Sequence, residues 1–290
     1  VHVILAIFLV LIITSSFDNL DYALIAKTIC FSAVITTLYG ILQVTGFDPL
    51  GKLPVYANFE HNHFSALIDH PTTLGTYLSL CYPFFLFFEG KKYKIGLLIV
   101  ILGIFLSKSS MAITAFIFSF LFYLIFINRN KKFNLSFTLF ISFLCMNFIY
   151  FNPEFNKLSG GLSGRLEIWK MAIAHIKDNP VWGQGLGIIP SWNLHVFTEH
   201  TQIVSVQWIY LHNDYLELIA EIGLIGLFLT FLVISNSLKN FHYRSDNKLG
   251  IIYLVSFISF LINMFGTFPM ELAPNALLGL IAFCGVEKIS

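Results

Sequence analysis

The chain has 290 residues, of which 57% are hydrophobic and only 11% are charged. Soluble domains carry about a quarter charged residues, so this composition excludes an ordinary soluble protein and indicates a polytopic membrane protein. The formal net charge of +1 and the lack of a basic patch give no support to nucleic-acid binding.

Apolar runs recur along the chain at a length close to the roughly 20 residues that a membrane-crossing helix needs. They predict an all-α bundle of about nine transmembrane helices. The predicted spans are 1–16, 21–45, 72–88, 95–107, 111–128, 133–151, 215–236, 250–267 and 273–287. Because the sequence starts at Val1, inside an apolar run, we expect it to lack earlier helices. The four cysteines lie within apolar runs, at no spacing typical of disulfides or zinc sites.

Basic residues in short loops predict the orientation of the bundle. Three loops carry them: Lys91, Lys92 and Lys94; Arg129, Lys131 and Lys132; Lys239, Arg244 and Lys248. Strict alternation of nine spans puts these three loops on one side, which we interpret as cytoplasmic. The opposite side then holds the loops 46–71, 107–110, 152–214 and 268–272.

The long loop divides a single membrane domain into three parts, which are N-terminal helices (1–151), an extracytoplasmic loop (152–214) and C-terminal helices (215–290). Apolar residues at helical spacing predict an amphipathic helix in the loop. They are Leu166, Trp169, Ile173 and Ile176. Asn179-Pro180 should end this helix. Apolar residues also alternate near Val206, but too briefly to predict a strand.

Two residues of the loop are candidates for chemistry. Arg165 starts the amphipathic helix, where a guanidinium and free backbone N–H groups could hold a phosphate; the alternative is a solvated surface arginine. His212 precedes a membrane helix, whose positive end favours a neutral imidazole that can accept a proton from a hydroxyl nucleophile. The alternative is that His212 is a histidine at the membrane surface that only forms a hydrogen bond to a neighbouring residue. We expect both side chains to face one cavity open to the outer leaflet.

Carboxylates follow His212 at helical spacing. Asp214, Glu217 and Glu221 fall three and four residues apart and therefore lie on one helix face. Glu221 lies within an apolar run, where an ionisable group is costly and is a functional candidate, unless it pairs with a polar group for packing.

Three further patterns carry weaker signals. Gly183-x-Gly185-x-Gly187 has neither the strand before it nor the helix after it that a dinucleotide site needs, so it predicts a structural turn. Lys108 adds a cation to the outer side. A cluster of metal-ligand residue types could bind metal, line a polar cavity or be a solvated loop. Its members are Glu60, His61, His63, Asp69 and His70.

These motifs together resemble those of the O-antigen ligase and polymerase superfamily of bacterial membrane glycan transferases. The matching patterns are Ser-Gly-Arg-x-x-x-Trp (163–169), Pro-x-x-Gly-x-Gly-x-Gly (180–187), His-Asn-x-Tyr-Leu-Glu followed by Gly-x-x-Gly (212–226), Tyr-Gly-Ile-Leu-Gln (39–43), and His-Pro with Leu-Gly-x-Tyr-Leu (70–78). The resemblance covers most of the chain.

The resemblance implies a fold similar to C-type glycosyltransferases and an inverting transfer that needs neither metal nor cofactor. The donor would be a glycan on undecaprenyl diphosphate, and the acceptor a hydroxyl at the outer face of the bacterial inner membrane. Arg165 would hold the diphosphate and His212 would be the catalytic base. A second family arginine is absent near Ser109-Ser110, where Lys108 is the nearest cation.

Further substrate contacts would come from Lys108, Trp169, Asp214 and Glu217, of which the two carboxylates could orient His212. The acceptor would be a saccharide, the lipid A core or a protein, which corresponds to a polymerase, a ligase or a protein O-oligosaccharyltransferase. Two other classes stay open, a membrane transporter with Glu221 and Asn263 lining its path and a non-catalytic assembly subunit. The absence of a clear internal repeat disfavours a transporter.

Overall fold

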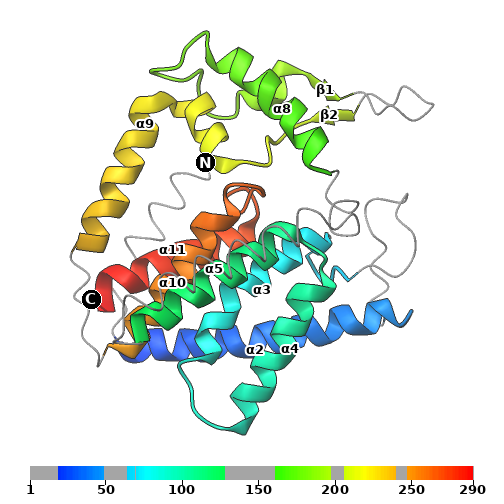
Figure 1. Ribbon diagram of the computed structural model, residues 1–290, viewed down its shortest axis with the longest axis vertical. Coiled ribbons are helices and arrows are strands. Elements are labelled where there is room, and N and C mark those ends of the chain that lie inside the picture. Colours follow the sequence, from blue (N-terminus) through cyan, green and yellow to red (C-terminus); the bar gives the residue numbers. More distant parts are fainter. Residues whose placement is uncertain are drawn as a thin grey trace.

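The computed structural model describes residues 19–48, 64–68, 70–127, 161–196, 206–239 and 247–289. Within these ranges the chain forms eight α-helices, one 3-10 helix and one two-stranded ladder (Figure 1). The elements are α2 (Asn19–Val44), α3 (Pro71–Phe85), α4 (Lys91–Leu106), α5 (Ser110–Ile127), α8 (Gly161–Ile176), η1 (Ile189–Trp192), β1 (Leu194–Val196), β2 (Val206–Trp208), α9 (Asp214–Lys239), α10 (Lys248–Asn263) and α11 (Ala273–Ile289). The predicted all-helical architecture is therefore confirmed.

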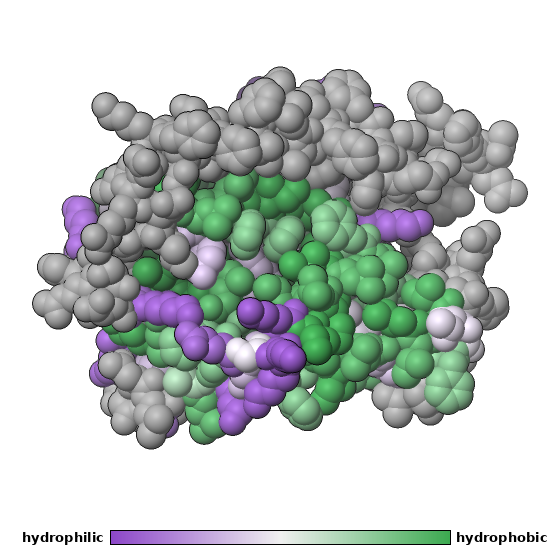
Figure 2. Space-filling model, turned by 60° about the horizontal axis from the view of Figure 1, so that its bottom comes forward, coloured by the Kyte–Doolittle hydropathy of each residue, from purple (hydrophilic) through white to green (hydrophobic). Residues whose placement is uncertain are grey.

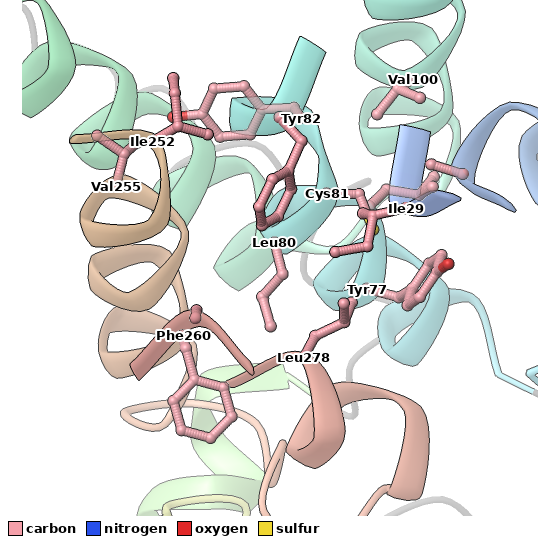
Figure 3. Close-up of a cluster of buried hydrophobic side chains, with 14 of the residues drawn as sticks. Ile29, Tyr77, Leu80, Cys81, Tyr82, Val100, Ile252, Val255, Phe260 and Leu278 are labelled. Atoms are coloured by element: carbon pink, nitrogen blue, oxygen red, sulfur yellow. The ribbon is translucent and has the colours of Figure 1, made fainter. Parts of the chain in front are cut away.

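Helices α3 and α10 form the centre of the bundle, with α2, α4, α5 and α11 around them (Figure 1). Nearly every side chain of α3 is buried, including Leu74, Leu78 and Tyr82. Figure 3 shows this core, in which Leu80 and Tyr82 of α3 lie near Ile252 and Val255 of α10. Burial on all sides explains why the sequence of α3 has no charged residue on any face.

Small polar residues join α3 to α10 inside this core. Ser256 Oγ donates to the carbonyl of Leu80 at 2.8 Å, and Ser259 Oγ donates to the carbonyl of Ser79 at 2.8 Å. Asn263 Nδ2 donates to Ser79 Oγ at 3.0 Å. Such bonds satisfy buried polar groups that have no water to bind and fix the register of the two helices.

One end of the bundle, the Lys248 end, gathers two of the predicted basic loops. Lys248 Nζ lies 6.0 Å from the ring centroid of Phe87, just before the loop that carries Lys91. Asn247 Nδ2 donates to the carbonyl of Ile289 at 2.6 Å, which brings the end of α11 to the same place. The alternation of α3, α4, α10 and α11 matches the predicted topology.

The other end, the His70 end, gathers the segments predicted to be extracytoplasmic. His70 caps α3, because its Nδ1 accepts from the amide of Thr72 at 3.2 Å. The α4–α5 turn packs against α3 so tightly that a Cβ on Gly75 would lie 2.3 Å from Ser107 Oγ. The loop 264–272 and the start of α9 meet here too, since the amide of Asp214 donates to the carbonyl of Met264 at 2.9 Å.

Two of the described helices are long and apolar enough to cross a membrane, Asp21–Val44 in α2 and Asp214–Asn236 in α9. Shorter apolar helices cover Ser110–Ile125 and Lys248–Asn263. Figure 2, which brings α2 and α4 forward, shows a broad apolar surface broken by a compact hydrophilic group. The predicted spans 1–16 and 133–151 lie outside the described residues, and the count of nine spans stays a prediction.

The predicted continuous span 215–236 is broken in the middle. Gly223 has φ 70° and ψ −178°, which no α-helical residue adopts, and it divides α9 into two segments. Asp214, Glu217 and Glu221 all belong to the first segment, whereas the residues from Leu224 to Ser237 include no charged side chain. The break therefore separates a polar part of α9 from an apolar part.

A small ladder completes the described structure. β1 pairs antiparallel with β2, in a register that puts Leu194 opposite Trp208. Val206 and Trp208 thus form a strand, although their short alternation did not predict one. Pairing with β1, which lies shortly before it in the chain, supplies the backbone hydrogen bonds of this strand.

Candidate active site

Helix α8 carries Arg165 in its first part, and its buried face differs from the predicted one. Ile168, Ala172 and Ile176 are buried, whereas Leu166 is 42% and Ile173 is 44% exposed. The buried residues recur every four positions and therefore form one stripe. Of the predicted apolar face, Ile176 is buried and Trp169 is partly buried, whereas Leu166 and Ile173 are exposed, so the residues buried within the protein form a second stripe that overlaps the predicted one.

The buried stripe of α8 packs against the segments before and inside α9. Its partners include Leu194, Leu211 and Ala220. Trp169 Nε1 adds a hydrogen bond of 2.9 Å to the carbonyl of Leu211. Because Arg165 and Trp169 lie one turn apart on the same side of α8, this bond brings the arginine side of the helix to the residue that precedes His212.

His212 sits in a short backbone turn, where its ring contacts the aromatic side chain of Phe268. Its φ of 53° is in the left-handed region, which few residues other than glycine adopt. The imidazole meets Phe268 edge to face, with ring centroids 4.7 Å apart at 72°. Tyr210 stacks on the same Phe268, at 4.8 Å and 11°. Phe268, from the loop after α10, thus shields one side of His212.

The environment of His212 favours its uncharged form. Burial, together with the positive charges of Arg165 and His70, lowers the pKa of His212 to about 3. The three groups come from α8, from the cap of α3 and from the segment before α9. The charge of Arg165 therefore lies near His212, although 46 residues separate them in the sequence. A neutral imidazole can accept a proton at neutral pH.

The predicted carboxylates hold the backbone on both sides of His212. Glu217 Oε1 accepts from the amide of Leu211 at 2.5 Å. Asp214 Oδ2 accepts from the amide of Met270 at 3.0 Å, which fastens the loop of Phe268. Asn213 Oδ1 accepts from the amides of Tyr215 and Leu216, both at 3.1 Å, and so caps α9. The position of His212 is fixed by this set of bonds.

Lys108 occupies the α4–α5 turn at the His70 end. Its φ is 50°, and its side chain is exposed. The turn is built by Ser107, whose Oγ donates to the carbonyl of Ile104 at 2.6 Å and accepts from the amide of Ser109 at 3.3 Å. A cation is thereby held at the end of the bundle where His70 and the start of α9 lie.

The glycine motif of 183–187 docks onto the break in α9. The amides of Gln184 and Gly185 donate to the carbonyls of Ala220 and Glu221, at 2.8 and 3.0 Å. Glu221 Oε1 in turn accepts from the amide of Gly187 at 2.7 Å. The predicted structural turn thus supplies hydrogen-bond donors to carbonyls that the broken helix leaves without helical partners.

Among the described residues, no group of three or more histidine, cysteine or acidic side chains could hold a metal ion. Glu60, His61, His63 and Asp69 lie outside the described residues. His70, the remaining member of that cluster, serves as the cap of α3, with Thr72 Oγ1 at 2.7 Å from its Nδ1.

Comparison with protein families gives one match. A family model described as O-antigen ligase matches residues 95–231, the part of the chain that contains Lys108, Arg165, His212 and the glycine motif. This stretch of the chain, residues 95–231, is similar to the O-antigen ligase family. The match suggests a ligase- or polymerase-like role in glycan transfer, and it accompanies apolar helices long enough to cross a membrane among the described residues. No curated protein matches its sequence.

Sequence reasoning missed two residues that shape this site. Phe268 lies in a Gly-Thr-Phe-Pro turn far from the other motifs, and a lone aromatic residue there gives no signal of contact with His212. Gly223 stood out in the sequence only as part of the Gly-x-x-Gly pattern, which does not indicate a break in the helix. The spacing of the carboxylates before it and the uncharged run after it could have indicated a boundary at this glycine.

Proposed function

We propose that this protein moves a glycan from an undecaprenyl-diphosphate carrier to an acceptor hydroxyl at the outer face of the bacterial inner membrane. The observation that carries the proposal is a neutral His212 whose pKa is lowered in part by the nearby charge of Arg165. An uncharged base beside a permanent cation suits a reaction in which a hydroxyl attacks and an anion leaves.

The proposed reaction is a single inverting displacement. His212 accepts the proton of the acceptor hydroxyl while its oxygen forms a bond to the anomeric carbon of the glycan. The bond from that carbon to the diphosphate oxygen breaks, and its electron pair leaves with undecaprenyl diphosphate. Arg165 stabilises the negative charge that develops on this leaving group, because its planar guanidinium offers two parallel N–H donors to phosphate oxygens.

The other predicted residues have supporting roles in this proposal. Glu217 and Asp214 hold the backbone around His212 through the amides of Leu211 and Met270. Trp169 holds α8 to the same segment. Lys108 is the second cation for the diphosphate, in place of the family arginine that this sequence lacks. Such a reaction requires above all that the base and the cation that binds the diphosphate are held close to the same bound substrates.

A reconstituted transfer reaction tests the proposal. Purified protein in proteoliposomes receives an undecaprenyl-diphosphate-linked glycan together with a saccharide, a lipid A core or a protein acceptor. Transfer to one acceptor, maintained in excess chelator, supports a metal-independent transferase and identifies it as a polymerase, a ligase or a protein oligosaccharyltransferase. Absence of transfer to all three acceptors, from protein that binds the donor, contradicts the proposal and favours a non-catalytic assembly subunit.

A further inference from the structure

The turn that follows α8 exposes large apolar side chains at its tip. The side chain of Trp182 is 74% exposed and that of Val181 is 44% exposed. Both lie between Pro180 and Gly183, where the chain reverses direction. Exposed apolar side chains that gather on one surface mark a place of contact with a partner or a membrane.

This tip lies directly against the apolar part of α9. The amide of Leu224 donates to the carbonyl of Pro180 at 2.9 Å, and the amide of Ile225 donates to the carbonyl of Val181 at 3.3 Å. The contact is close enough that a Cβ on Gly223 would lie 2.2 Å from the carbonyl oxygen of Val181. The backbone of the turn and the backbone of α9 are thus one rigid unit here.

The apolar surface of the tip continues along α9. Leu224 is 51%, Phe228 is 60% and Leu229 is 53% exposed, in a helix segment that contains no charged residue from 224 to 237. The window Asp214–Asn236 is one of the two described helices that are apolar and long enough to cross a membrane. The second segment of α9 thus exposes large apolar side chains, and the exposed Trp182 follows the residues whose carbonyls bond to the start of that segment.

The level of Trp182 along α9 is the level at which its polarity changes. Carboxylates stop at Glu221, the break is at Gly223, and the apolar run starts at Leu224. The interface between water and acyl chains is the region that tryptophan prefers in membranes, because the indole ring is apolar while its N–H binds water or headgroups.

We propose that Trp182 and Val181, together with the apolar start of the second segment of α9, form a contact surface for phospholipid at the boundary between headgroups and acyl chains. This contact holds the turn and α8 on the outer surface of the bilayer. It acts on lipid whatever the catalytic roles of Arg165 and His212, so it does not depend on the proposed transfer reaction.

Fluorescence quenching by brominated phospholipids tests the proposal in the full-length protein in nanodiscs. The bromines are placed in the acyl chain close to the headgroup, and a parallel sample carries them near the chain end. Trp182→Phe is compared with Trp192→Phe, whose indole is half-buried and donates to Gln184 Oε1 at 3.1 Å. Both variants keep an aromatic ring, and equal helix content by circular dichroism shows that both are folded.

We expect the Trp182→Phe protein to lose most of the quenching by bromines near the headgroup, and the Trp192→Phe protein to keep it. Bromines near the chain end should quench Trp182 less. Iodide in the aqueous phase should quench wild type and Trp182→Phe to a similar extent. Unchanged bromine quenching in Trp182→Phe would overturn the proposal. Strong iodide quenching of Trp182 would indicate a solvated turn, and quenching by neither agent would indicate a protein segment over it; both results also overturn the proposal.

Discussion

The indole of Trp169 donates a hydrogen bond of 2.9 Å to the carbonyl of Leu211, and this bond joins two motifs that lie 42 residues apart. One turn before Trp169 lies Arg165, and one residue after Leu211 lies His212. The contact thus connects the candidate anion clamp to the candidate base through one side chain and one peptide.

Trp169→Phe tests whether this connection matters. The variant keeps an apolar ring but removes the N–H donor, so the carbonyl of Leu211 loses its partner. A net hydrogen bond contributes about 1 kcal/mol, and we expect a fall of about fivefold in the transfer rate at saturating donor. Trp192→Phe, which removes the bond to Gln184 in the same loop, is the control and should change the rate less. Equal rates in the Trp169→Phe and wild-type proteins would assign the bond no role in catalysis.

The glycine motif offers a matched pair of substitutions. Gly183 and Gly187 have nearly the same left-handed φ, 75° and 73°. A Cβ on Gly183 would lie 2.4 Å from the carbonyl oxygen of Glu221, whereas a Cβ on Gly187 meets nothing within 4 Å. Gly187→Ala should therefore cost only the backbone strain of about 1–2 kcal/mol. Gly183→Ala should cost clearly more, because the turn must also separate from α9.

Thermal unfolding in detergent measures this difference as a lower midpoint temperature for Gly183→Ala than for Gly187→Ala. Equal midpoints for the two variants would show that the close contact between Gly183 and the break in α9 does not contribute to stability in solution.

The pH dependence of transfer should reflect the shielding of His212. Burial and the charges of Arg165 and His70 lower the pKa of His212 to about 3, so the imidazole stays neutral, and active as a base, well below pH 6.5. Phe268→Ala admits water and should raise the pKa of His212 towards its ordinary value of about 6.5. Transfer by this variant at about pH 5.5 should then fall severalfold relative to wild type, with a smaller loss at about pH 8.

The control for Phe268→Ala is Phe265→Ala, from the same loop. Phe265 is 57% exposed, and its ring lies 4.4 Å from that of Tyr215. Its pH profile should match that of wild type.

Since the unfolded chain binds the His212 proton near pH 6.5 and the folded chain only near pH 3, stability should also decrease as the pH falls through this interval. If the transfer rates of Phe268→Ala and wild type fell in the same way at low pH, Phe268 would not shield His212.

Much of the helical architecture was predictable, because long apolar runs can fold in few other ways. Asn179-Pro180 was predicted to end the amphipathic helix, and α8 ends shortly before it, at Ile176. The motifs correctly indicated the family whose model matches residues 95–231. The break at Gly223 was missed because it depends on backbone hydrogen bonds from Pro180 and Val181, a tertiary pairing that no local pattern encodes. Burial of Ile168 and Ala172 was not predicted, because the surface that α8 buries within the protein is set by Leu194 and Leu211 on other elements.

The predicted topology can be tested at the two ends of the bundle. Lys92 is exposed at the start of α4 and Lys108 is exposed just after its end, so one helix separates them. Single cysteines at these positions should react with a membrane-impermeant maleimide from opposite sides, with Lys108→Cys labelled in intact spheroplasts. The native thiols of Cys30, Cys81 and Cys284 are buried and should give little background. Labelling of both new cysteines from the same side would contradict the orientation on which the site depends.

The central claim, that His212 and Arg165 perform glycan transfer together, is tested most directly by the rate of transfer in proteoliposomes with a lipid-linked donor. His212→Ala removes the base and should lower the rate at least about 100-fold. Arg165→Lys keeps the charge but loses the planar pair of donors, and should lower the rate at least about tenfold. Lys170→Ala, at an exposed position of the same helix, should transfer at the wild-type rate. Near-normal transfer by His212→Ala or Arg165→Lys, at equal amounts of folded protein, would contradict the account.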